Sequence, residues 1–437
     1  MMDESHVMGP IHTKMNSKPT SEFKCMNDDN NNTYLSFLLL LPPRIIIIML
    51  KGFSRLPRLP VSAVHRICKM EMSEATQPSL PKFIPLEDPG TTSTTISNGF
   101  RFRVVSYNIL AQVYVKSSLF PHSPSPCLRW KARSQAILTV LKSFEADFLC
   151  IQELDEYDSF YKGNMDSYGY SSLYIQRSGQ KRDGCGIFYK RNSAELMLKE
   201  EIEYNDLVKS IEDRTDLCNH QSDVAVDTEN QEAVEGLPQR NFSDDRGDPN
   251  DPRVRLKRDC VGLMAAFKLN DPSHHLVIVA NTHIYWDPEW ADVKLAQVKY
   301  LQYRLAQFKA VISNKFNCTP SVIVAGDFNS TPGDEVYQYL VSGNSSTMSV
   351  AENGEERAIP LCSLYASIGG EPPFTNCTPG FTGTLDYIFF SDSGYLKTLS
   401  FLELPGPESP DVVGGLPNYH HPSDHLPIGT DFEVIIR

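Results

Sequence analysis

Polar side chains that could carry out chemistry stand at the ends of short apolar segments of this sequence. They are Asn108 after 104–107, Gln152-Glu153 after 148–151, Asn281-Thr282-His283 after 276–280, Asp327-Phe328-Asn329 after 322–325, Asp386 between Leu385 and Tyr387, and Ser423-Asp424-His425 before the last apolar segment. Each alone has an ordinary explanation, because Asp and Asn after strands usually form turns and a lone histidine such as His283 is often a core residue. As a set, they combine carboxylates, carboxamides and histidines with no nucleophilic Ser or Cys placed among them.

This inventory of side chains suits metal-assisted hydrolysis of a phosphate ester. Mg²⁺ prefers oxygen ligands and binds through one or two carboxylates together with substrate phosphate. The attacking water must be deprotonated and the charge on phosphorus neutralised, and histidine donors suit the second task. A zinc pair formed by His421 and His425 is a weaker interpretation, because the glutamate of such motifs is missing and Pro422 fits poorly in a helix.

The segments that must position these groups are predicted strands and helices. Residues 101–108 alternate as in a strand, and residues 131–142 carry apolar side chains at helical spacing. Further predicted strands are 148–152, 185–189, 261–269, 276–282, 322–325, 386–390 and 428–436, and a predicted helix covers 290–308. Strands mixed with helices, without repeats, predict an α/β sandwich around sizeable sheets.

The net charge of −13 looks unfavourable for an enzyme acting on nucleic acid, but it is unevenly distributed. Residues 204–252 hold thirteen Asp/Glu and four Lys/Arg, a local charge of −9 that leaves −4 for the rest of the chain. This segment is predicted to be a disordered acidic insertion, because it has few aromatic residues and many acids. A bound divalent metal would supply positive charge where a phosphate lies.

Residues 1–99 are predicted to be a disordered or targeting leader, and residues 100–437 the catalytic domain. The apolar runs 37–41 and 45–50 are too short and too interrupted for a membrane span, which needs about 20 apolar residues. Residues 49–70 contain five Lys/Arg and no acidic residue, which suits either an organellar transit peptide or a flexible basic leader. A further hypothesis takes Met49 as the true start of the protein.

Six segments, in order, resemble the exonuclease–endonuclease–phosphatase superfamily, and more narrowly the carbon catabolite repressor 4 deadenylases and their nocturnin-like relatives. They are 106–111 (SYNILA), 149–153 (LCIQE), 281–283 (NTH), 326–330 (GDFNS), 385–388 (LDYI) and 422–427 (PSDHLP). The resemblance runs from about residue 100 to the C-terminus. It implies a DNase I-like, four-layered α/β sandwich with two central sheets flanked by helices.

The resemblance also implies how the metal and the attacking water are held. Glu153 would be the principal ligand of Mg²⁺, with Asn108 beside it and Asp424 in a second metal region. One or two ions would act, and Mn²⁺ would be able to substitute. Asp327 would orient or deprotonate the water, and Asn329 would hold the scissile phosphate.

Two histidines are implied as phosphate contacts: His425, oriented by Asp386, and His283. A histidine paired with a carboxylate is biased towards its charged form, which suits an anionic transition state. Pro288 and Phe381 match positions between which such deadenylases hold an adenine, and Trp286 lies next to Pro288. Stacking contributes about 1–3 kcal/mol per base, although Phe381 packed against Pro379 is an equally good interpretation.

The expected activity is therefore a Mg²⁺-dependent 3′–5′ exoribonuclease that shortens poly(A) tails of mRNA and releases 5′-AMP. Two alternatives stay open, a nocturnin-like 2′-phosphatase acting on NADP(H) and a non-catalytic RNA-binding scaffold. The expected partner is single-stranded RNA, with Lys181, Arg182 and residues 253–258 as candidate backbone contacts. Association with the Not-type deadenylase complex is doubtful, because no leucine-rich repeat pattern occurs. The expected location is cytoplasm and nucleus, or a mitochondrion or plastid through the basic leader.

Overall fold

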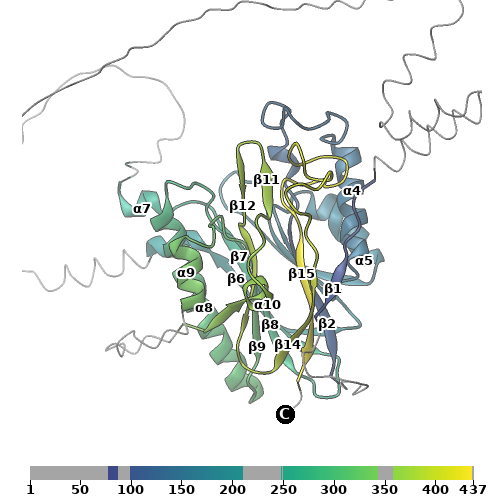
Figure 1. The fold of residues 1–437 in the computed structure, drawn as a ribbon. Coiled ribbons are helices and arrows are strands. Elements are labelled where there is room, and N and C mark those ends of the chain that lie inside the picture. Colours follow the sequence, from purple (N-terminus) through teal and green to yellow (C-terminus); the bar gives the residue numbers. More distant parts are fainter. Residues whose placement is uncertain (1–76, 87–98, 210–247, 249, 343–357, 436–437) are drawn as a thin grey trace, which may run out of the picture. The chain divides into compact units, whose positions relative to one another are not determined.

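The computed structural model describes residues 77–86, 99–209, 248, 250–342 and 358–435, which fold around two β-sheets (Figure 1). Within these residues, the first sheet has seven strands in the order β1-β14-β15-β2-β3-β5-β4. Their bounds are β1 Phe83–Pro85, β2 Arg101–Asn108, β3 Phe148–Gln152, β4 Tyr170–Gln176, β5 Gly184–Lys190, β14 Leu396–Leu402 and β15 Ile428–Val434.

The second sheet of the described part has six strands in the order β10-β13-β9-β8-β7-β6. Their bounds are β6 Ala194–Glu203, β7 Val261–Leu269, β8 Leu276–His283, β9 Ser321–Asp327, β10 Leu361–Ser363 and β13 Asp386–Ser391. A short hairpin of β11 Asn376–Thr378 and β12 Phe381–Gly383 stands apart from both sheets.

Each sheet contains one parallel pair of strands, and these pairs decide where the polar clusters go. In the first sheet β2 runs parallel to β3, with Asn108 opposite Gln152. In the second sheet β8 runs parallel to β9, with His283 opposite Asp327. The carboxyl ends of parallel strands lie at one edge, so residues that follow these four strands are brought together.

The antiparallel neighbours deliver the last two clusters to the same edge. Strand β13 begins with Asp386 directly opposite Asp327 of β9. Strand β15 begins with Ile428 opposite Ser106 of β2, so the segment before β15 lies beside the end of β2. An antiparallel strand begins at the edge of the sheet where its neighbour ends. The residues that β13 and β15 bring to this edge therefore lie at or just before the start of those strands.

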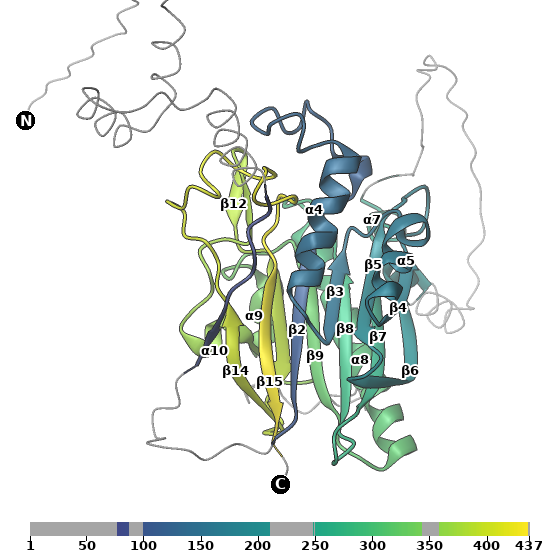
Figure 2. The same ribbon diagram turned by 90° about the vertical axis from the view of Figure 1, so that its right-hand side faces the viewer.

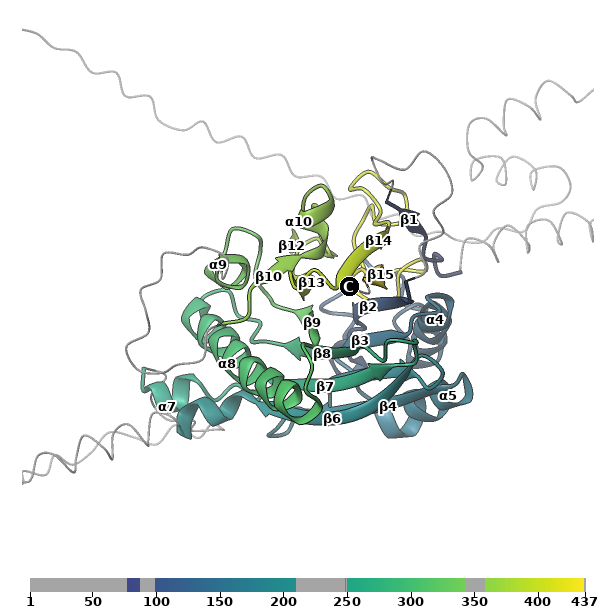
Figure 3. The same cartoon turned by 90° about the horizontal axis from the view of Figure 1, so that it is seen from below.

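Alternating side chains divide the molecule into layers. Between the sheets, Val104 and Cys150 pack in one core with Leu263, Val279 and Ile323. The residues that alternate with these along each strand point to the outer face of the sheet and pack against helices. The outer face of the first sheet packs against helix α4 Trp130–Ser143, and that of the second sheet packs against helix α8 Ala291–Phe316. Figure 3 shows α8 and α9 (Glu335–Ser342) outside one sheet, and α4 and α5 (Lys162–Ser167) outside the other. The predicted four-layered α/β sandwich is confirmed.

The remaining helical elements are short and lie in connections. They are α7 Pro252–Arg255, α10 Leu364–Ile368, the 3-10 turns Gln112–Tyr114 and Tyr204–Asp206, and the π-helical turn Tyr157–Tyr161. Helix α8 extends beyond the predicted residue 308 to Phe316, because its buried side chains continue through Ile312. It ends where Asn317 adopts a left-handed conformation with φ of 50°.

The expected start of the folded part near residue 100 is wrong. Residues Phe83–Pro85 form β1, which pairs antiparallel with Ser400–Leu402 of β14 at the edge of the first sheet (Figure 2). The Arg103 guanidinium lies 3.8 Å from the centre of the Phe83 ring. A strand of three residues between prolines has no alternation from which the sequence could reveal it.

The expectation of a disordered insertion over 204–252 is also wrong at the ends that the structure describes. Tyr204 is fully buried, and its hydroxyl lies 2.7 Å from Oγ1 of Thr282 at the end of β8. Asp251 caps α7 by accepting a hydrogen bond from the Arg253 amide. The acidic residues between 210 and 247, like residues 1–76 and 87–98 of the predicted leader over 1–99, lie outside the described residues. Among the described residues, no helix has the length and apolar character needed to cross a membrane.

Candidate active site

The six polar clusters meet where the ends of both sheets face each other. The contact that joins the sheets directly is a hydrogen bond of 2.9 Å from Nδ2 of Asn108, on β2, to Oδ2 of Asp327, on β9. A second bridge lies beneath it, where Nε2 of Gln152 donates to Oδ1 of Asn281 at 2.7 Å. Asn281 in turn donates to the carbonyls of Ile151 and Gly186. Asn281 is thus a structural bridge between the sheets, which its place in a strand-end motif does not reveal.

Glu153 is the carboxylate best placed to hold a metal ion. It follows β3 directly and adopts a left-handed backbone with φ of 52°, an uncommon conformation for a residue with a side chain. Oε1 accepts a hydrogen bond from Nδ2 of Asn108 at 3.1 Å, and Oε2 accepts one from the Ala111 amide at 2.9 Å. Burial, with the negative charges of Asp424 and Asp183, raises the pKa of Glu153 to about 7.

Asn108 faces the carboxylates with its amide nitrogen. Its oxygen Oδ1 accepts a hydrogen bond from the Leu110 amide at 3.0 Å, while Nδ2 donates to Glu153 and to Asp327. In this arrangement, Asn108 orients two carboxylates, and its role as a direct metal ligand stays a prediction. Its main-chain carbonyl accepts a hydrogen bond of 2.7 Å from Oγ of Ser423, which fixes the segment that carries Asp424.

Asp327 lies at the centre of the cluster. Gly326 precedes it with φ of 155°, and any Cβ there would lie 2.1 Å from the Thr282 carbonyl oxygen, so only glycine fits this position. Oδ1 of Asp327 accepts a hydrogen bond from the Asn329 amide, and Oδ2 lies 3.5 Å from Nε2 of His283. Burial and the charge of Asp386 raise the pKa of Asp327 above its usual range.

The two histidines differ in charge. Burial lowers the pKa of His283 to about 4 despite the nearby Asp327, so His283 is neutral at pH 7, and its buried Nδ1 has no hydrogen-bond partner among the described residues. Burial opposes protonation of His425 too, but the charges of Asp386 and Asp327 outweigh it and hold its pKa well above the usual value.

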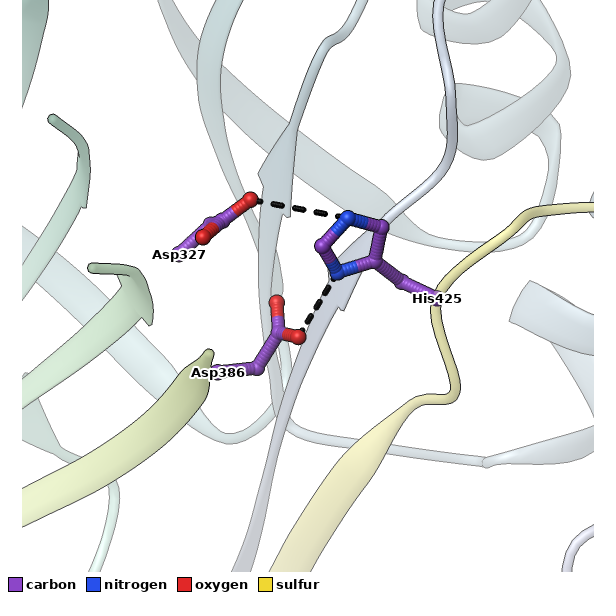
Figure 4. A group of neighbouring side chains, drawn as sticks. All are labelled: Asp327, Asp386 and His425. Carbon is purple, nitrogen blue, oxygen red and sulfur yellow. Dashed lines mark hydrogen bonds and ion pairs between the residues drawn. The ribbon is translucent and has the colours of Figure 1, made fainter. Parts of the chain in front are cut away.

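Figure 4 shows the ring of His425 lying between two carboxylates. Nδ1 lies 2.7 Å from Oδ2 of Asp386, and Nε2 lies 3.7 Å from Oδ2 of Asp327. Oγ1 of Thr375 donates a hydrogen bond of 2.6 Å to the same Asp386 oxygen, which fixes that carboxylate. His425 is therefore a cation whose Nε2 faces the centre of the site.

Asn329 and Asp424 stand at the margins of this cluster. The side chain of Asn329 donates to the Ile284 carbonyl at 3.0 Å, and its own carbonyl accepts from Nζ of Lys294. Asp424 is partly exposed, and its charge raises the pKa of Glu153. The Asn329 amide also donates to Oδ1 of Asp327 at 2.9 Å, which ties Asn329 to the central carboxylate.

The residues predicted to stack on a base lie on exposed surface. Trp286 is 61% exposed and Phe381 is 43% exposed, and Pro288 is exposed as well. Phe381 lies in β12, where its ring covers Gly383. Among the described residues no ring contact joins Trp286 to Phe381, and the centre of the Trp286 ring lies 6.1 Å from that of Tyr285.

Two buried residues that support the site were not foreseen. Arg133 of α4 is 1% exposed, and it donates to the carbonyls of Ile109 and Pro422 at 2.9 and 2.8 Å and also to the carbonyl of Leu110. Its position four residues before the buried Ile137, on the apolar face of a helix, was the available signal. The second residue is Asp183 before β5, which is fully buried and accepts a hydrogen bond from the Tyr114 hydroxyl at 2.7 Å.

Two groups of side chains could hold a cation, and the chemistry favours the one that contains Glu153. Ligand atoms of Asp327, Asp386 and His425 lie within 4.8 Å of one another. However, a protonated His425 already paired with Asp386 has no lone pair to offer. Around Glu153, by contrast, burial and the charges of Asp424 and Asp183 disfavour the ionised carboxylate and raise its pKa, and a bound Mg²⁺ would stabilise that ionised form. The residues present therefore fit a hard divalent cation at Glu153.

Comparison with known proteins agrees with this geometry. A sequence model of the endonuclease/exonuclease/phosphatase family matches residues 105–425. The chain is 63% identical over 353 residues to the carbon catabolite repressor protein 4 homolog 4 of Arabidopsis thaliana, covering 80% of this chain and 82% of that protein. It is 28% identical to the CCR4-Not complex 3′-5′-exoribonuclease subunit Ccr4 of Schizosaccharomyces pombe, covering 79% of this chain but 51% of that protein.

Solved structures show the same fold. The crystal structure of ANGEL2, a 2′,3′-cyclic phosphatase, in complex with adenosine-2′,3′-vanadate has a TM-score of 0.60 and 25% identity, covering 82% of this chain and 99% of that chain. The human Nocturnin catalytic domain has a TM-score of 0.51 at 21% identity, covering 81% of this chain and 98% of that chain, and so supports the fold alone. The chain belongs to the endonuclease/exonuclease/phosphatase family.

Proposed function

We propose that this chain is a Mg²⁺-dependent 3′–5′ exoribonuclease that shortens poly(A) tails. The observation that carries the proposal is the convergence of Glu153, Asp327 and the charged His425 at the meeting edge of the two sheets. The name of the Schizosaccharomyces relative, a 3′-5′-exoribonuclease subunit, supports the choice of an RNA substrate.

The proposed reaction is hydrolysis of the last phosphodiester bond. Water oxygen bonds to phosphorus, and the bond from phosphorus to the 3′-oxygen of the preceding nucleotide breaks. This 3′-oxygen leaves with the electron pair and takes a proton. The products are 5′-AMP and an RNA shortened by one nucleotide with a free 3′-hydroxyl.

The residues of the chain divide this work by charge and position. Asp327 receives the proton of the attacking water, because burial brings its pKa nearer to the working pH and its Oδ2 faces the centre of the site. His425 donates a charged hydrogen bond from Nε2 to a phosphate oxygen, and neutral His283 donates a weaker one. A Mg²⁺ ion bound at Glu153 would neutralise phosphate charge and lower the pKa of a bound water.

The decisive experiment compares substrates on the purified full chain with Mg²⁺. They are an end-labelled RNA ending in poly(A), a matched RNA with a non-A tail, an RNA ending in a 2′,3′-cyclic phosphate, and NADPH. Stepwise loss of the A tail alone is the expected result. Phosphate release from NADPH with intact RNA would move the assignment to a nucleotide 2′-phosphatase, and opening of the cyclic end alone would move it to an RNA-end phosphatase.

Glu153→Gln and a chelated sample serve as controls. RNA binding without turnover in every Mg²⁺ sample would instead support the non-catalytic scaffold.

Association with a Not-type complex, and a location in cytoplasm, nucleus or an organelle, are further proposals. Co-purification with tagged complex subunits, and microscopy of the full chain against a chain lacking residues 1–70, would test them.

A further inference from the structure

Lys294 is a nearly buried lysine beside the active site, and the proposed reaction gives it no task. It lies near the start of α8 and is 5% exposed. Its Nζ donates a hydrogen bond of 2.8 Å to the main-chain carbonyl of Asn329. Burial lowers the pKa of Lys294, and the negative charges of Asp334, Asp287 and Asp327 oppose that shift. An amine is costly to bury unless a partner replaces the lost hydration, and the Asn329 carbonyl is such a partner.

Asn329 depends on support because its backbone has an unfavourable conformation. Its φ is 44°, in the left-handed region that residues with a side chain seldom adopt. Its amide donates to Oδ1 of Asp327 at 2.9 Å, and its Nδ2 donates to the Ile284 carbonyl at 3.0 Å. The hydrogen bond from Lys294 fixes the remaining polar group of its main chain, the carbonyl. These three bonds together determine where the side chain of Asn329 points.

The direction of the Asn329 side chain matters because its amide group has a donor to spare. Nδ2 of an asparagine carries two N–H groups, and the Ile284 carbonyl accepts from one of them. Asn329 is partly exposed and lies next to the central Asp327, which leaves the second N–H for a phosphate oxygen of a substrate. Such a hydrogen bond stabilises a transition state only while its donor is held in the correct direction.

Helix α8 holds both of the connections that follow the parallel strands β8 and β9. Gln297, three residues after Lys294, is fully buried and accepts a hydrogen bond of 2.9 Å from the Tyr285 amide. Residues three positions apart lie on one face of a helix. Gln297 thus fixes the connection after β8, and Lys294 fixes the connection after β9. The start of this helix therefore sets the position of the two connections relative to each other.

We propose that Lys294 is a positioning residue of the active site, which acts through the Asn329 carbonyl to keep the Asn329 side chain directed at the scissile phosphate. The proposal rests on the proposed hydrolysis of a phosphodiester bond. Lys294 itself does not touch the substrate. Its loss should lower kcat more than it weakens RNA binding, because the misdirected hydrogen bond is one that strengthens in the transition state.

The test is a double-mutant cycle in kcat, measured on the full chain with Mg²⁺ and the RNA ending in poly(A). Lys294→Met removes the ammonium from a side chain of similar length, and it should lower kcat about tenfold with KM within about twofold of the wild type. Asn329→Gly removes the side chain but accepts the left-handed backbone. In that background, Lys294→Met should lower kcat by less than about twofold, because the group it positions is already absent.

Lys309→Met is the matched control, since Lys309 is a partly buried lysine towards the other end of α8 whose pKa burial also lowers. This variant should keep the wild-type kcat. An unchanged kcat in Lys294→Met, or equal losses with and without the Asn329 side chain, would overturn the proposal. Melting temperatures of all variants show whether each is folded. Should Lys294→Met not fold, Lys294→Gln, whose side chain is shorter, takes its place in the cycle.

Failure of the proposed function is recognised separately. If the wild type leaves RNA intact but hydrolyses NADPH or a 2′,3′-cyclic phosphate end, the same cycle is run on that phosphate ester. If it hydrolyses none of them, hydrogen–deuterium exchange of residues 326–333 reports on the Asn329 turn without turnover. Faster exchange in Lys294→Met than in Lys309→Met would support the role of Lys294 in fixing the turn. Equal exchange in both variants and the wild type would refute it.

Discussion

At the scale of single residues, burial and the nearest charges determine the chemistry of the site. Burial of Glu153, together with the negative charges of Asp424 and Asp183, raises its pKa to about 7. Asp327 and Asp386 instead lie beside His425, whose pKa they raise well above the usual value. One side of the site is thus suited to a metal cation and the other already contains a protonated histidine.

Metal affinity should depend on pH through Glu153. Protons and Mg²⁺ compete for this carboxylate, and Glu153 is increasingly protonated as the pH falls below about 7. The Mg²⁺ concentration for half-maximal activity should rise about fivefold between pH 7 and pH 6. Titrations of activity with Mg²⁺ at each pH would show this, and a requirement that stays constant from pH 6 to pH 8 would contradict the assignment.

Removing the negative charge next to His425 should weaken transition-state stabilisation. In Asp386→Asn, the histidine loses the partner that favours its charged form, so kcat should drop about a hundredfold near pH 7.5. Part of the activity should return as the pH is lowered and His425 regains its proton. Profiles of kcat against pH for the wild type and the variant would reveal this recovery at low pH. An unchanged kcat in the variant would exclude His425 as the phosphate donor.

At the scale of secondary-structure elements, the two parallel strand pairs and their antiparallel neighbours bring the site residues together. Hydrogen bonds from other segments of the chain then hold these residues in place. Arg133 of α4 ties the segment after β2 to the segment before β15 through the Ile109 and Pro422 carbonyls. The strand β1 and the residues before it tie the other side, since Oγ of Ser79 donates to Oδ2 of Asp411 at 2.8 Å. The segment carrying Asp424 and His425 is therefore held from both sides.

Arg133→Met should be strongly destabilising. It would leave buried carbonyls without donors, at a cost of about 3 kcal/mol or more, and would release the segments that position Asn108 and Asp424. Urea unfolding of the variant, beside Lys131→Met on the exposed face of the same helix, would measure the loss. Similar stability of both variants would show that the buried guanidinium is dispensable.

The N-terminal strand should be required although it lies before the expected domain start. Deleting residues 1–98 removes β1 and the Ser79 contact, whereas deleting residues 1–69 keeps both. The shorter protein should melt about 5 °C or more below the longer one and should have a lower kcat. Calorimetry and turnover on both proteins give the answer, and equal behaviour would mean that β1 is an accessory strand.

At the scale of the whole molecule, buried ionisable groups make stability depend on pH in opposing directions. Burial lowers the pKa of His421 to about 4, despite the opposing negative charge of Asp411. The unfolded chain binds a proton there from about pH 6.5 downwards, whereas the folded chain does so only near pH 4. His421 therefore destabilises the fold as the pH falls through this window.

A comparison of variants isolates this contribution. Between pH 6.5 and pH 4, wild type should lose on the order of 3 kcal/mol of unfolding free energy relative to His421→Gln. Glu153→Gln should behave oppositely without metal, since the raised pKa of Glu153 means that wild type loses relative stability as the pH rises from 4.5 towards 7. Urea unfolding in chelator across this range would detect both slopes, and parallel curves for all three proteins would disprove the linkage.

The amino-acid sequence by itself determined the class of fold and singled out the strand-end residues that the structure brings together. Alternation of apolar residues identified the central strands, because a buried strand needs side chains of one kind on each face. The polar residues at their ends, such as Asn108 and Asp327, stood out because they interrupt that pattern. Local periodicity carries this information, so no tertiary contact was needed to find them.

Only the tertiary structure decided how these residues work together. Arg133, Asp183 and the short strand β1 act through contacts with segments far away in the chain, and nothing in their local sequence specifies the partner. The division between neutral His283 and charged His425 likewise depends on which carboxylate each ring faces after folding. Burial and distance set such charges, and both exist only once the two sheets have packed together.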